Sequence, residues 1–177
     1  MEYKNHSYVG GEVSEKKILL FIILISIAII FGGIILVGGN SPSAPSVAAS
    51  SNVKVAVNRD SFNWGNIPIN GGFAIKTFFI RNTGTETLKL FNIKTSCHCT
   101  KAHLTIDGKD SPDFGMSGIS PYTGEVKPGK EAKLTVVFDP AFHGPQGTGP
   151  IERYISVETN SQENSKLTFT LTGVVVK

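Results

Sequence analysis

The two cysteines of this chain lie one residue apart, at Cys97 and Cys99, in the segment TSCHCTKAH. In an extended strand, residues two apart point to the same face, with Cα atoms roughly 6.5 to 7 Å apart. That spacing is at the limit for an unstrained disulfide, and it suits two thiolates that hold one soft metal ion. A tight turn could instead form a disulfide or redox pair, and buried cysteines can simply be small apolar residues. All three interpretations remain open at this point.

Three further side chains are of a type that could complete a metal site. His103 has the same parity as the cysteines if the strand continues, whereas Met116 and His143 lie in two long segments rich in Gly and Pro, 107–130 and 139–150. Imidazole suits copper or zinc, and a thioether favours copper. The candidate metal ligands are therefore Cys97, Cys99, His103, Met116 and His143, with copper or zinc as the cofactor.

The direction of the chain decides which of these ligands can meet. If the chain reverses at Cys97–Thr100 and again within 107–130, the 139–150 loop returns to the cysteine end and His143 can approach. If the strand runs straight through to Ile106, His143 goes to the far end. We expect the reversal, and with it a site that contains His143.

The sequence gives no support for an enzyme or a nucleic-acid-binding protein. It contains no G-x-S-x-G motif, no P-loop and no paired catalytic carboxylates, so we expect a non-catalytic protein. The net charge is +3 and charged residues make up 18% of the chain. The basic residues form no run, whereas a nucleic-acid footprint is a clustered basic stripe.

The longest apolar run, ILLFIILISIAIIFGGIILV, covers residues 18–37 and carries no charge. A helix of about 20 residues spans the roughly 30 Å hydrocarbon core of a bilayer. A cleaved signal peptide is the alternative, because SVAAS looks cleavable after Ala49. A signal peptide, however, has an apolar part of about 7 to 15 residues with its cleavage site directly after it. We therefore predict an uncleaved transmembrane helix at 18–37 in the lipid bilayer.

The flanks of this run predict its orientation and the organisation of the chain. Lys16 and Lys17 directly precede the run, and no basic residue follows it until Lys54. The positive-inside rule then predicts a single-pass protein of the plasma membrane, with its N-terminus in the cytoplasm and its C-terminal domain outside. The predicted parts are a cytoplasmic tail at 1–17, the helix at 18–37, a flexible Gly/Ser/Pro/Ala linker at 38–52 and one domain at 53–177.

After residue 53 the hydrophobicity alternates with period two. EAKLTVVFD (131–139) is a clear example, and IERYISVET places Ile151, Ile155 and Val157 on one face. This pattern, with its β-branched and aromatic residues, is typical of half-buried strands. About seven short strands without a helical segment predict an all-β fold, an immunoglobulin-like β-sandwich.

The stretch FNWGNIPINGGFAIKTFFIRNTGTETLKLFNIKTSCHCT, with Pro128-Gly129, Phe138-Asp139 and the final strands over 151–176, resembles the DUF1573 family of bacterial envelope proteins. That family shows an aromatic residue followed by Gly, a strand that ends in N-T-G, another strand and a Cys-x-Cys-Thr turn. The resemblance covers about residues 53–176, although the residue between the cysteines is commonly Gly and here is His98. It implies an immunoglobulin-like sandwich, related to domains of cell surfaces and cilia, with unidentified envelope protein partners. The alternative function is thus a protein-interaction or structural module, in which Cys-x-Cys only shapes a turn.

Overall fold

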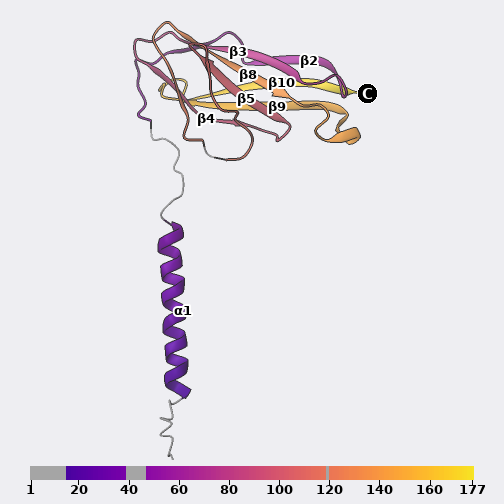
Figure 1. Ribbon diagram of the computed structural model, residues 1–177. Coiled ribbons are helices and arrows are strands. Elements are labelled where there is room, and N and C mark those ends of the chain that lie inside the picture. Colours follow the sequence, from indigo (N-terminus) through magenta and orange to yellow (C-terminus); the bar gives the residue numbers. More distant parts are fainter. Residues whose placement is uncertain (1–14, 39–46, 119) are drawn as a thin grey trace, which may run out of the picture. The chain divides into compact units, whose positions relative to one another are not determined.

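The structure is a computed structural model that describes residues 15–38, 47–118 and 120–177. Helix α1 (Glu15–Gly38) and the β-domain are separate units of the chain (Figure 1). Most of the predicted tail at 1–17 and the central part of the predicted linker at 38–52 lie outside the described residues.

Helix α1 contains the apolar run. The side chains from Ile18 to Ile30 are exposed on every side of the helix. The sequence correctly predicts a helix here, since the run is rich in good helix formers and free of proline. The predicted transmembrane span at 18–37 needs correction, because none of the helices in the described part of the chain is long and apolar enough to cross a membrane.

The β-domain consists of two five-stranded sheets. The first has the order β1-β3-β8-β5-β6 and the second β2-β10-β9-β4-β7. The strands are β1 (Val55–Val57), β2 (Ser61–Pro68), β3 (Ala74–Asn82), β4 (Leu88–Thr95), β5 (Thr100–Ile106), β6 (Lys109–Asp110), β7 (Thr123–Val126), β8 (Glu131–Phe138), β9 (Gly149–Thr159) and β10 (Lys166–Val176). Strand β2 pairs in parallel with β10, and the other described strand pairs are antiparallel.

The core lies between the two sheets. In β8 the alternate residues Ala132, Leu134, Val136 and Phe138 are at most 2% exposed, as the period-two pattern predicts. Aromatic rings of the two sheets meet in the core, where the ring centroids of Phe78 and Phe169 are 4.9 Å apart. The prediction of an immunoglobulin-like sandwich is therefore confirmed, with more strands than expected.

Strands β2, β6 and β7 account for most of the difference. β2 contains two asparagines, a glycine and a final proline, all of which are uncommon in strands. It lies at the edge of its sheet, where such residues are tolerated because one side of the strand needs no partner. β6 and β7 are short strands within the segment 107–130 that looked like one long loop.

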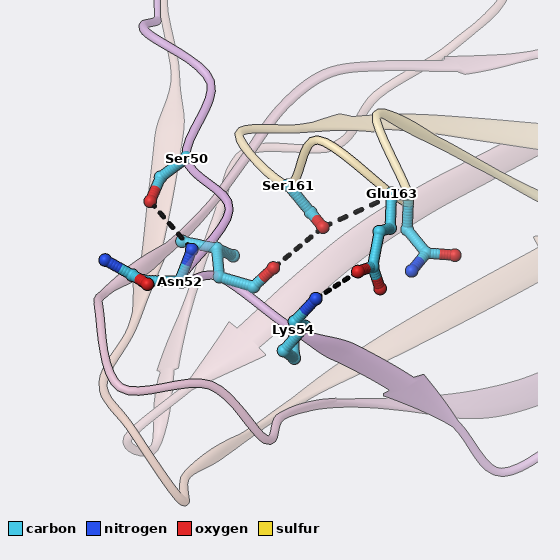
Figure 2. A network of polar contacts seen from close by, with 7 residues as sticks. Ser50, Asn52, Lys54, Ser161 and Glu163 are labelled. Carbon is cyan, nitrogen blue, oxygen red and sulfur yellow. Dashed lines mark hydrogen bonds and ion pairs between the residues drawn. The ribbon is translucent and has the colours of Figure 1, made fainter.

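The chain that enters the β-domain is tied to the turn between β9 and β10 (Figure 2). The Ser50 amide donates a hydrogen bond to the Asn160 carbonyl (2.8 Å), and the buried Ser161 hydroxyl donates to the Val53 carbonyl (2.8 Å). Lys54 and Glu163 form an ion pair on the surface, where such pairs stabilise little. Hydrogen bonds of Ser50 and Ser161 therefore attach the entering chain to this turn.

We predict that Ser161→Ala lowers the free energy of unfolding by about 1 to 2 kcal/mol, because it leaves the Val53 carbonyl without its donor. Urea denaturation measures this change. The control is Ser165→Ala, which removes an exposed hydroxyl and keeps the hydrogen bond from the Thr159 amide to the Ser165 carbonyl. Equal midpoints for the two variants would contradict the prediction.

Candidate functional site

The two cysteines lie in a turn that carries the chain from one sheet to the other. Strand β4 ends at Thr95 in the second sheet, and β5 begins at Thr100 in the first. The Thr95 hydroxyl is within 3.0 Å of both the Cys97 and the Thr100 carbonyl oxygens, and the Thr100 amide donates to the Cys97 carbonyl (3.1 Å). The threonine side chain thus closes the turn from within.

The reversal brings the end of β8 beside the cysteines. β5 and β8 are antiparallel, with Thr100 opposite Phe138, and the Asp139 amide donates to the Cys99 carbonyl (2.9 Å). The 139–150 loop consequently starts at the cysteine end. This is the arrangement that the sequence predicts if the chain reverses at Cys97–Thr100.

Cys97 and Cys99 form a disulfide, with Cα atoms 5.2 Å apart. The turn brings the two Cα atoms closer than the roughly 6.5 to 7 Å of an extended strand, and at this shorter distance a disulfide can form. The Nε2 atom of His143 is 3.7 Å from Cys97 Sγ. One ligand atom from each of Cys97, Cys99 and His143 lies within 4.8 Å of the others, which is close enough for the three to contact one metal ion once the disulfide is reduced.

The three residues differ in their exposure to solvent. Cys99 is 3% exposed and packs against Ile67, Phe138 and Val175 in a second, smaller apolar cluster. Cys97 is half-buried, and His143 is exposed at the start of the short 3-10 helix Gly144–Gly147. The three-residue group therefore has one buried sulfur, that of Cys99, and is exposed to solvent at His143 in the 139–150 loop.

Arg153 of β9 completes the site. Its Nε donates to Cys99 Sγ (3.2 Å), and its guanidinium carbon lies 5.4 Å from the centre of the Phe138 ring. Burial lowers the pKa of Arg153 from its ordinary value, but that value is far enough above neutral for the guanidinium to stay charged. A permanent positive charge thus contacts the buried sulfur.

Arg153 is the functional side chain that the sequence analysis missed. It has the same parity in β9 as Ile151 and Ile155, which were assigned to the apolar face. A lone arginine on the inward face of a strand needs a partner for its charge. That exception to the alternation is the signal from which the residue could have been predicted.

The other two predicted ligands are His103 and Met116. His103 is on β5, and its Nδ1 is 3.5 Å from an Asp113 carboxylate oxygen. It stands outside the three-residue group and, with His98 and Phe142, lines a cleft of about 380 Å³. Met116 is 46% exposed and follows Gly115, whose carbonyl accepts a hydrogen bond from the Thr95 amide. A role for Met116 as a ligand stays a prediction.

The disulfide closes a very small loop, with a sequence separation of 2. The stabilisation from a cross-link increases with the length of the loop, because it arises mainly from restriction of the unfolded chain. For a loop of three residues it is about 1.5 kcal/mol, roughly half of that for a 15-residue loop. The disulfide is therefore a weak stabiliser of the fold.

The chain is similar to several solved structures. A Porphyromonas gingivalis W83 protein of unknown function has a TM-score of 0.54 and 20% identity over 73% of this chain, which spans 50% of that protein. Human CEP192 PapD-like domain 7 has a TM-score of 0.44 and 18% identity, with coverage of 77% of this chain and 95% of that one. The secreted serine protease VesC of Vibrio cholerae has a TM-score of 0.42 and 8% identity, with coverage of 71% and 23%. At 20% identity the likeness to the Porphyromonas gingivalis protein shows the fold alone.

Comparison of the sequence with protein families gives a family assignment. No curated protein matches the chain. The model of HYDIN/CFA65/VesB-like, Ig-like domains matches residues 53–173, which are more than half of the chain. The Ig-like part of the predicted resemblance is thus confirmed, whereas DUF1573 is not the family that matches. The chain belongs to the HYDIN/CFA65/VesB-like family of Ig-like domains.

Proposed function

We propose that the β-domain is a non-enzymatic binding module that holds one soft metal ion, copper or zinc, when the Cys97–Cys99 disulfide is reduced. One observation carries the proposal: the ligand atoms of Cys97, Cys99 and His143 lie within 4.8 Å of one another. Reduction turns the two sulfurs into thiol ligands beside an imidazole, and this donor set suits soft and borderline ions.

The charges around the site favour Cu(I) over Zn(II). Two thiolates and a monovalent ion have a net charge of −1, which the guanidinium of Arg153 balances from 3.2 Å. With a divalent ion the thiolate site is already neutral, and the partly buried charge of Arg153 is then left without a counter-charge. The same guanidinium stabilises the thiolate form of Cys99, which metal binding requires.

An extracytoplasmic location fits the oxidised site. Disulfides persist mainly in oxidising compartments such as the bacterial periplasm and the cell surface, and Cys97 and Cys99 form one here. The Cys-x-Cys-Thr turn also supports a relationship to the DUF1573 envelope proteins. The proposal therefore includes other envelope proteins as partners.

Elemental analysis of the full-length chain tests the metal site. The protein is purified in mild detergent, because large apolar side chains of α1 between Ile18 and Ile30 are exposed, then reduced and loaded anaerobically with Cu(I) or Zn(II). We expect one ion per chain, lost in both Cys97→Ser and Cys99→Ser. We expect His143→Ala to weaken binding by about ten- to a hundredfold, the range found even for residues that only support metal ligands.

The matched control is His98→Ala. His98 lies between the cysteines in sequence but is outside the three-residue group. The His98→Ala variant should bind the ion with the affinity of the unmodified chain. Absence of bound metal after loading of the reduced protein, or an equal effect of His98→Ala and His143→Ala, would rule out the proposed site.

A second candidate function is binding of a protein partner. Phe73 (65% exposed), Ile75 (58%) and Phe142 (52%) are large apolar side chains at or near the cysteine end of the first sheet. Clusters of exposed apolar residues commonly mark interaction surfaces. A reduced protein that takes up no metal would favour this function, with the Cys-x-Cys turn as a structural element of the surface.

A further inference from the structure

The two sulfurs of the disulfide are unequal in access. Cys97 is half-buried beside the exposed His143, whereas Cys99 is 3% exposed among the side chains of the smaller apolar cluster. Thiol–disulfide exchange begins when a thiolate attacks one sulfur, and the rate depends on which sulfur can be reached. An incoming thiolate therefore reaches Cys97 Sγ and leaves Cys99 as the departing sulfur.

The departing sulfur is the one that contacts a positive charge. A thiolate that forms among apolar side chains is normally unfavourable, which makes a buried cysteine a poor leaving group. Here Arg153 Nε lies 3.2 Å from Cys99 Sγ, and the Thr100 hydroxyl oxygen lies 3.7 Å from the same atom. These groups are placed to stabilise the negative charge at the moment that the disulfide opens.

Arg153 is held in this position by its other contacts. Its Nη1 donates to the Glu152 carbonyl (2.8 Å), and the guanidinium packs over the Phe138 ring. A side chain fixed in this way needs little rearrangement when charge appears on the sulfur, as in other preorganised sites. Cys97 is thus the sulfur that a thiolate can reach, and Cys99 is the sulfur beside the positive charge. Both differences favour attack on Cys97 with Cys99 as the leaving group.

We propose that Cys97–Cys99 is an exchangeable disulfide that protein dithiols reduce by attack on Cys97, with Cys99 leaving as a thiolate beside Arg153. This inference concerns the oxidised state and does not depend on metal binding. It adds a directional redox step to a chain in which the disulfide stabilises the fold only weakly.

The steps balance as follows. A thiolate of the dithiol forms a bond to Cys97 Sγ while the bond between Cys97 and Cys99 breaks, and the electron pair of that bond stays on Cys99. The second thiol of the dithiol loses its proton to solvent. The resulting thiolate attacks the first sulfur of the dithiol, which is bonded to Cys97 Sγ in the mixed disulfide. Cys97 then leaves as a thiolate, and Cys97 and Cys99 each take up a proton from solvent. In total the dithiol is oxidised to a disulfide, and the chain gains two electrons and two protons.

The first test identifies the attacked sulfur. Full-length protein is treated with glutathione in the presence of a chelator, and freed thiols are trapped with iodoacetamide. Fragmentation of the tryptic peptide of residues 95–101 in the mass spectrometer separates Cys97 from Cys99, because His98 lies between them. We expect glutathione on Cys97 and the alkyl group on Cys99. Glutathione mainly on Cys99, or equally on both, would overturn the proposal.

The second test measures the role of Arg153 through the rate at which dithiothreitol, with the same chelator present, opens the disulfide. We expect Arg153→Gln to slow opening by roughly three- to tenfold, since loss of a neighbouring cation makes the thiolate a poorer leaving group. Arg153→Lys should recover part of the rate. The control is Arg81→Gln, an exposed arginine at the opposite end of the first sheet, which should leave the rate unchanged.

The two tests also separate this proposal from the metal site, because the chelator keeps metal away throughout. An unchanged opening rate in Arg153→Gln, with the fold verified by circular dichroism, would contradict the role of the guanidinium. If that variant fails to fold, two measurements test the proposal instead: which cysteine carries glutathione, and the rate at which dithiothreitol opens the disulfide of Arg153→Lys. Opening of Arg153→Lys at less than a tenth of the unmodified rate would then count against the proposal.

Discussion

Asn82→Ala is expected to lower the free energy of unfolding by about 3 kcal/mol or more, although it changes a polar residue at the end of a strand. Asn82 is completely buried. Its amide nitrogen donates to the Glu86 carbonyl (2.7 Å) and the Val126 carbonyl (2.8 Å), and its side-chain oxygen accepts from the Gly84 amide (3.0 Å). Alanine would leave all three groups without partners, and each unsatisfied buried group costs about 1 to 3 kcal/mol.

Urea denaturation of the full-length chain measures this loss as a lower transition midpoint. The matched control is Asn70→Ala, because Asn70 is exposed, and substitutions of exposed residues usually change stability by less than about 0.5 kcal/mol. A loss of under 1 kcal/mol for Asn82→Ala would show that water or a shifted neighbour replaces the three hydrogen bonds.

Asn82 also shows how far the sequence predicts the fold. Alternation of apolar residues predicts β3, β4, β8, β9 and β10 closely, because burial of one face is a property of each strand by itself. The N-T-G segment that contains Asn82 is visible in the sequence as part of a family pattern. Its hydrogen bond to the Val126 carbonyl joins separate parts of the chain, and spacing along one strand does not reveal it.

The candidate site was predicted to a similar degree. The meeting of His143 with the cysteines follows from the expected reversal of the chain, which the Thr95 hydroxyl and the pairing of β5 with β8 establish. The disulfide remained one of three alternatives, because the sequence does not determine how sharply the turn bends. His103 faces Asp113 because that carboxylate comes from the segment after β6, and this contact depends on tertiary structure.

Phe138→Ala is expected to cost about 3 to 5 kcal/mol, the usual range for removal of a buried aromatic ring. Phe138 is 2% exposed, and its ring stacks on Trp64 with centroids 5.8 Å apart. Arg153 lies on the same ring. Phe138 thus contributes to the stability of the fold and also supports Arg153 beside Cys99. Removal of its ring should affect the free energy of unfolding and the position of Arg153.

The milder variant Phe138→Leu separates the two effects, with Phe78→Leu as the matched control. Phe78 is a completely buried phenylalanine of the main core, and it belongs to the cluster that excludes the cysteines. We expect both leucine variants to lower the urea midpoint by similar amounts, because each removes a similar volume from a packed core.

Phe138→Leu should change the fluorescence of Trp64, the single tryptophan of the chain, on which the Phe138 ring stacks. Of the two variants, only Phe138→Leu should slow the opening of the disulfide by dithiothreitol. The reason is that Phe138 supports the guanidinium that contacts Cys99, whereas Phe78 contacts the Phe169 ring. Equal rates of opening in the two variants would mean that Arg153 keeps its position without the aromatic ring. In that case the hydrogen bond to the Glu152 carbonyl would be enough to hold the charge beside the sulfur.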